Sequence, residues 1–107
     1  MKYMMIVCYD PTIEPVDDDN ETDTWVSEMD GRGVRLEGRP LDPGDATTVR
    51  VRNGQVLVSD GPFAETKEVM VGYDFLECAN LEEAIEVASK HPLAKRGAME
   101  LRPFGTD

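Results

Sequence analysis

Two segments of this chain are largely apolar on both faces of an extended strand, and they constrain its fold more than any other feature. In residues 2–9 and 68–78, both alternating faces of an extended strand carry apolar side chains. A strand of that kind is typical of the centre of a sheet that is covered on both sides. We therefore expect two central strands in one sheet, with both faces of the sheet buried.

A hairpin is predicted within residues 47–59, where Asn53 and Gly54 separate two runs rich in β-branched residues. This pair of residues tolerates positive φ at both central positions of a type I′ turn. The register then pairs Arg52 with Gln55, Val51 with Val56, and Val49 with Val58. All four valines share one face, and we expect that face to be buried.

A first helix is predicted near residues 22–31. Apolar side chains recur there at helical spacing, with Thr24 as a candidate N-cap and Gly31 as a candidate stop. The apolar residues are Trp25, Val26 and Met29.

The first helix lies in a strongly acidic stretch. Residues 14–30 hold eight acidic side chains and no Lys or Arg, a composition typical of a solvated face. Asp17, Asp18 and Asp19 lack the alternating ligands, the glycine and the distal glutamate of a calcium loop, so we expect no metal site there.

A second helix is predicted after residue 80. Asn80 and Glu83 have the spacing of a capping box, and His91-Pro92 ends the helix. Its expected buried stripe consists of Leu81, Ala84, Ile85 and Ala88. Further strands are expected at residues 34–41 and 98–103.

The order of these elements predicts the fold. Strand, helix, strand, inserted hairpin, strand, helix and strand make a ferredoxin-like α+β plait with residues 2–9 and 68–78 antiparallel at its centre. A length of 107 residues fits one domain over residues 1–107. Because two helices cover only one face of such a sheet, we expect a homodimer to cover the other.

Charge and cysteine content exclude several classes of function. A formal net charge of −11 disfavours nucleic acid, because each phosphate contact needs a Lys or Arg. No apolar run is long enough to span a membrane, and we expect a cytoplasmic protein. Cys8 and Cys78 are expected to be buried, at opposite edges of the sheet and without a disulfide.

One edge of the predicted sheet gathers the side chains that can carry chemistry. Antiparallel pairing sets Tyr9 and Asp10 beside the 60–67 loop, and the second helix returns His91 to the same edge. Asp60 and His91 are the candidate catalytic acid–base pair. The candidate ligand-binding residues are Tyr9, Asp10, Pro62, Phe63 and Lys67.

Each member of the catalytic pair also has a structural interpretation. A histidine that closes a helix interacts favourably with the last carbonyls and with the helix dipole. An aspartate before Gly-Pro commonly bonds its own turn backbone. The sequence carries no dinucleotide, phosphate-loop or metal motif, so we expect no cofactor.

Residues 60–68 (DGPFAETKE), with Thr48, Val49 and Arg50 upstream and Gly97 and residues 100–103 at the end, resemble the YCII-related family in its DGPF-domain branch. The resemblance implies a dimeric α/β-barrel in which two ferredoxin-like sheets face each other. It also implies Asp60 as the acidic site residue. The acidic 14–30 segment departs from the longer apolar first helix of such relatives.

The resemblance leaves two functions open. Some YCII-like members are enzymes built around a His and Asp pair, which implies a cofactor-free enzyme or binder of a small molecule. Other members resemble partners of extracytoplasmic-function sigma factors, which implies a regulatory protein without catalysis.

Overall fold

The computed structural model describes residues 1–13, 19–42, 44–62 and 67–105. Its elements are β1 (Lys2–Tyr9), α1 (Asp19–Gly31), β2 (Arg35–Pro40), β3 (Thr47–Arg52), β4 (Gln55–Asp60), β5 (Val69–Glu77), α2 (Leu81–Ser89), the 3₁₀ turn η1 (Pro92–Lys95) and β6 (Gly97–Pro103). Four strands form an antiparallel sheet in the order β2-β5-β1-β6, and β3 and β4 form a second sheet. The predicted ferredoxin-like α+β fold, with β1 and β5 paired at its centre, is confirmed.

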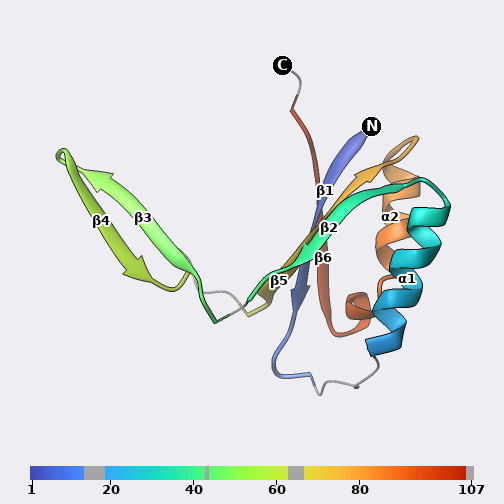
Figure 1. The fold of residues 1–107 in the computed structure, drawn as a ribbon, viewed down its shortest axis with the longest axis horizontal. Coiled ribbons are helices and arrows are strands. Elements are labelled where there is room, and N and C mark those ends of the chain that lie inside the picture. Colours follow the sequence, from blue (N-terminus) through green and yellow to red (C-terminus); the bar gives the residue numbers. More distant parts are fainter. Residues whose placement is uncertain (14–18, 43, 63–66, 106–107) are drawn as a thin grey trace.

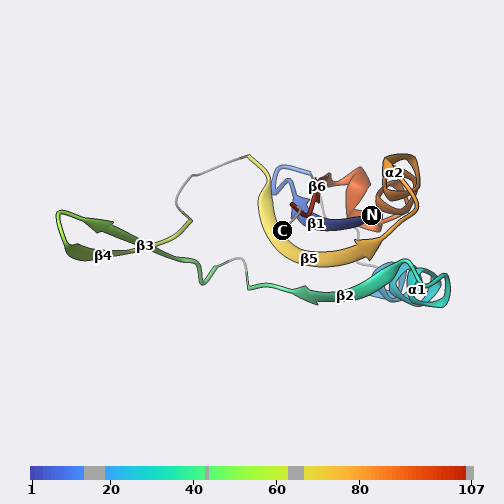
Figure 2. The ribbon, with the colours of Figure 1, turned by 90° about the horizontal axis from the view of Figure 1, so that it is seen from above.

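Both helices lie on one side of the four-stranded sheet (Figures 1 and 2). The core between helices and sheet is fully apolar at its centre, where Met5, Met29 and Val87 are 0% exposed. Met99 and Leu101 of β6 pack against this core. The remaining buried apolar residues are Tyr3, Val7, Trp25, Val34, Leu76, Cys78, Ala84 and Ala88.

The other side of this sheet is covered by neither helix, so the expectation that β1 is buried on both faces is wrong within one chain. Cys8, expected to be buried, is partly exposed for this reason. We call this side the open sheet face. The apolar side chains that alternation and register place on it are Met4, Ile6, Cys8, Met70, Tyr73 and Phe75.

The first helix starts earlier than predicted, at Asp19, and ends at Gly31 as expected. Thr24 is therefore not the N-cap; it lies inside the helix, where its hydroxyl donates to the Asn20 carbonyl at 2.8 Å. Trp25 and Met29 are buried, as their spacing predicted. In the part of the chain that the structure describes, neither helix is long and apolar enough to cross a membrane.

The capping of α2 follows the prediction. The Asn80 side chain accepts from the Glu83 N–H at 2.9 Å, and the Glu83 carboxylate accepts from the Ala79 N–H at 2.9 Å. The predicted buried stripe is partly wrong, since Leu81 and Ile85 are 51% and 52% exposed.

The face of α2 that is buried carries Val87 with Ala84 and Ala88. The Trp25 indole N–H donates to the Val87 carbonyl at 3.0 Å, which turns this face toward α1.

The hairpin has the predicted register, with Val49 opposite Val58 and Val51 opposite Val56. Asn53 and Gly54 have φ of 52° and 74°, as a type I′ turn requires. We call residues 47–60 the arm, because they project outward from the sheet on the side opposite the helices (Figure 2).

The four valines of the arm, which we call the valine face, are not buried as expected. Their exposed fractions are 61% for Val49, 58% for Val51, 66% for Val56 and 64% for Val58. The prediction of burial is wrong within one chain because the arm stands apart from the four-stranded sheet (Figure 1).

Candidate functional site

Asp10 forms a buried polar corner where β1 ends. It is 4% exposed, and its carboxylate accepts from the Thr12 N–H at 2.9 Å and from the Thr12 hydroxyl at 2.6 Å. The Lys67 ammonium lies 3.2 Å from the second carboxylate oxygen. Asp10 therefore joins the end of β1 to the end of the 60–67 connection, as the antiparallel arrangement predicted.

The Asp10 carboxylate keeps its negative charge at neutral pH. The hydrogen bonds from Thr12 lower its pKa, Lys67 lowers it further, and the two together outweigh the effect of burial. The Lys67 side chain is 69% exposed, so its ammonium is open to a further anionic or carbonyl-bearing group. Asp10 thus positions an exposed cation rather than supplying a proton.

The 3₁₀ turn η1 connects Asp10 with His91. The Asp10 N–H donates to the carbonyl of Arg96, which ends this turn, at 2.7 Å, and His91 is the residue that begins it. A short, hydrogen-bonded segment therefore links Asp10 to the turn that His91 begins.

His91 is buried, and its ring is held by two neighbours. Its Nδ1 accepts from the Leu93 N–H at 3.1 Å, so the side chain caps η1 rather than the carbonyls of α2. The ring meets that of Trp25 edge to face, with centroids 4.8 Å apart. Burial lowers the pKa of His91 from 6.5 to about 4, so the imidazole is neutral at pH 7.

The tautomer of His91 follows from these contacts. Because Nδ1 accepts a hydrogen bond, the proton of the neutral ring is on Nε2. Every buried side-chain nitrogen or oxygen among the described residues has a hydrogen-bond partner, and Nε2 has none among them, so Nε2 reaches the surface. His91 can donate one hydrogen bond from Nε2–H, as a neutral group.

Asp60 lies at the base of the arm, opposite Thr47. The peptide that follows it is fixed on both sides, because the Gly61 N–H donates to the Ala46 carbonyl at 2.8 Å and the Thr48 hydroxyl donates to the Gly61 carbonyl at 2.6 Å. Within the described residues, the Asp60 carboxylate itself accepts no hydrogen bond. The carboxylate is exposed and has no ion-pair partner among those residues either.

The structure does not join the two candidate residues by a contact: among the described residues of one chain, no hydrogen bond links Asp60 to His91. Tyr9 lies at the end of β1, half-buried between Val69 and Gly97. Pro62 is exposed, and Phe63 lies outside the described residues.

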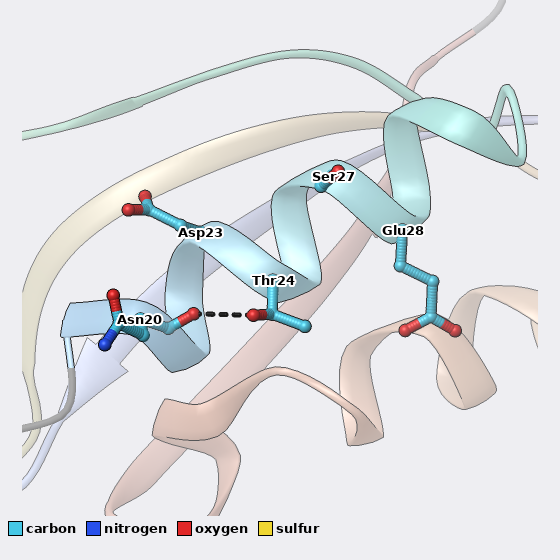
Figure 3. Close-up of a pocket in the computed structure, with 5 residues that line it drawn as sticks. All are labelled: Asn20, Asp23, Thr24, Ser27 and Glu28. Carbon is cyan, nitrogen blue, oxygen red and sulfur yellow. Dashed lines mark hydrogen bonds between the residues drawn. The ribbon is translucent and has the colours of Figure 1, made fainter.

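Two surface depressions lie elsewhere, along α1. One, of about 490 Å³, is a shallow hollow along one exposed side of α1, and its lining residues are Asn20, Asp23, Thr24, Ser27 and Glu28 (Figure 3). The other, of about 310 Å³, lies between α1 and the turn that follows α2 and includes Trp25, Lys90 and Lys95. Neither is lined by Asp10, Asp60 or His91.

The buried ion pair between Arg35 and Asp74 was not predicted from the sequence. The Arg35 guanidinium donates from Nε to the Asp74 carboxylate at 2.8 Å and from Nη1 to Asp30 at 3.1 Å, so it ties β2 to β5 and α1. A side chain at Gly38 would meet the Asp74 carboxylate, which explains the glycine there. The available signal was an aspartate within residues 69–76, which are otherwise uncharged.

Comparison with known proteins places the chain in a family. Residues 1–104 match the YCII-related domain. The chain is also similar to an uncharacterized protein of Rhizobium meliloti (strain 1021), with 33% identity over 117 residues that cover 92% of this chain and 89% of that protein. A domain match over nearly the whole chain means that the protein belongs to the YCII-related family.

Proposed function

We propose that this protein is a homodimer that binds a small organic molecule beside Asp10, Lys67 and His91. It catalyses proton transfer on that molecule without a cofactor. The observation that supports the proposal is the buried Asp10 carboxylate, which holds the exposed Lys67 ammonium at one end of the turn that His91 begins. Lys67 and the Nε2–H of His91 suit a ligand with a carboxylate or a carbonyl oxygen.

The roles within the pair follow from protonation. His91 is neutral at pH 7 with its proton on Nε2, so it serves as a hydrogen-bond donor that polarises a carbonyl, and it does not take the proton. Asp60, whose carboxylate is free of hydrogen bonds in the described part of the chain, is the proton acceptor. Tyr9, Pro62 and Phe63 would line the site.

The homodimer is part of this proposal because one chain leaves the open sheet face uncovered. Tyr73 lies 5.2 Å from Phe75, and Phe75 lies 5.5 Å from Phe104, measured between ring centroids. An aromatic group of this size on the exposed side of a sheet is typical of an interface. The assignment to the DGPF-domain branch, on residues 60–68, and the cytoplasmic location stay predictions.

The test uses the wild-type protein and small carbonyl compounds that carry an acidic C–H next to the carbonyl. The compounds are incubated with the protein in D₂O, and loss of the C–H signal is followed by ¹H NMR. We expect exchange of at least one compound with wild type, and none with Asp60→Asn, which keeps the shape but loses the base. Lys67→Ala is expected to weaken binding of the compound.

The alternative is a regulatory protein that binds another protein, such as a sigma factor. The exposed carboxylates of α1 favour this reading: Glu21, Asp23, Glu28 and Asp30. No exchange with any compound, together with a complex that is lost when Asp23 and Glu28 are changed to Asn and Gln, would replace the first proposal by this one.

A further inference from the structure

The arm is amphipathic, although no described element covers either of its sides. One side carries the valine face. The other side carries polar and charged side chains with a single leucine: Thr48, Arg50, Arg52, Gln55, Leu57 and Ser59. A polar side suits solvent, whereas four adjacent valines that are each more than half exposed exceed the scattered apolar side chains of an ordinary surface.

An isolated two-stranded hairpin is marginally stable in water, because it buries little apolar area. The arm is such a hairpin, joined to the rest of the chain by its base. Its valine face therefore needs a cover to hold the hairpin together.

The chain itself carries an uncovered apolar surface of the matching kind. The arm leaves the sheet on the side of the open sheet face. It points outward, however, and does not cover that face (Figure 2). Two copies related by a two-fold axis solve both problems, because the arm of each can cover the open sheet face of the other. Each copy then buries two surfaces, its own arm and its own open sheet face. Both areas count toward the roughly 800 Å² that each partner buries in a stable interface.

We propose that the arm docks its valine face on the open sheet face of a second copy of this chain. The inference rests on the proposed homodimer and names the segment that makes its contacts. The polar side of the arm, with Arg50 and Arg52, then stays in water.

The same docking brings a charged residue of each copy onto the open sheet face of the other. Side chains alternate along β4, so Asp60 stands on the same side as Val56 and Val58. Whatever surface covers the valine face therefore also meets the Asp60 carboxylate. On the open sheet face, Arg39 has no ion-pair partner among the described residues and offers the opposite charge.

The experiment compares two neighbouring residues of β4 that point to opposite sides of the arm. Val56→Asp places a charge in the valine face, and Leu57→Asp, at a position that is 48% exposed, is the matched control. Dimer dissociation constants are measured by sedimentation velocity over a range of concentrations. We expect Val56→Asp to weaken the dimer by about 100-fold or more, since a buried unpaired charge is strongly unfavourable, and Leu57→Asp to change it by less than about threefold.

A second measurement needs no variant. Hydrogen–deuterium exchange of the wild-type amides in residues 47–60 is compared above and below the concentration at which the dimer dissociates, and we expect protection only in the dimer. A wild-type protein that is monomeric at micromolar concentration would overturn the proposed homodimer. A wild-type dimer that Val56→Asp and Leu57→Asp leave equally tight, with arm amides that exchange at the same rate at both concentrations, would overturn the role of the arm and leave the homodimer standing.

Discussion

Trp25 and His91 meet edge to face, with ring centroids 4.8 Å apart and ring planes at 61°. Trp25 is also hydrogen-bonded to the carbonyl of Val87, so one indole connects α1 to α2 and to the turn that positions Asp10. The candidate site is thus built on the helix packing rather than on the sheet alone.

Trp25→Phe is expected to destabilise the protein. The substitution keeps a ring beside His91 but removes the N–H that donates to Val87, at a cost of about 1–2 kcal/mol. Trp25→Ala leaves a cavity at a position that is 3% exposed and should cost about 3–5 kcal/mol. Urea unfolding followed by circular dichroism measures both, and equal losses for Phe and Ala would show that the ring contact contributes nothing.

His91 makes stability depend on pH. Its pKa is about 4 in the folded chain and near 6.5 when unfolded, so between these values the unfolded state binds the proton more tightly. The stabilisation is fully present above about pH 6.5 and is lost as the pH falls toward 4, by up to about 3 kcal/mol. The free energy of unfolding measured from pH 4 to pH 8 tests this.

The control for that experiment is His91→Asn, whose side-chain oxygen can still accept from the Leu93 N–H but does not titrate. The many acidic residues give both proteins a common pH dependence, and the difference between them isolates the imidazole. Parallel curves for wild type and His91→Asn would contradict the lowered pKa.

The buried pair of Arg35 and Asp74 predicts an asymmetric response. Arg35→Met leaves the Asp74 carboxylate, 8% exposed, without its cation and should cost about 3–5 kcal/mol. Asp30→Asn removes the second partner of Arg35, which is 50% exposed, and should cost less than about 1 kcal/mol. Adding Asp74→Asn to Arg35→Met should restore part of the loss, and chemical denaturation of all three proteins checks the order.

Local signals predicted local structure well. The register of the arm follows from Asn53-Gly54 alone, and the start of α2 follows from Asn80 and Glu83, because these interactions lie within a few residues of each other. The buried side of α2 did not follow from its sequence. Apolar residues at Leu81, Ile85 and Val87 allow two overlapping stripes, and the distant hydrogen bond from α1 selects between them.

The burial of the valines was predicted wrongly, and the contacts of His91 were not predicted, for a related reason. Neighbouring residues predicted which valines share a side, but only the position of the arm relative to the sheet decides what covers them. His91 was placed correctly at the end of α2, whereas its ring packs against Trp25, which is far away in sequence. Long-range packing carries no signal in a single sequence without repeats or paired motifs.

The two aspartates of the proposed site should differ sharply when each is replaced by alanine. Asp60 accepts no hydrogen bond within the described residues of its own chain, so at concentrations where the protein is monomeric Asp60→Ala should change the free energy of unfolding by less than about 0.5 kcal/mol. Asp10 is buried and accepts two hydrogen bonds from Thr12 beside Lys67, so Asp10→Ala should clearly lower the melting temperature. Differential scanning calorimetry of both variants at pH 7 measures the contrast. A loss of 1 kcal/mol or more for Asp60→Ala, the size typical of a capping bond, would mean that this carboxylate holds its own turn, and the proposed proton acceptor would then have to be sought elsewhere.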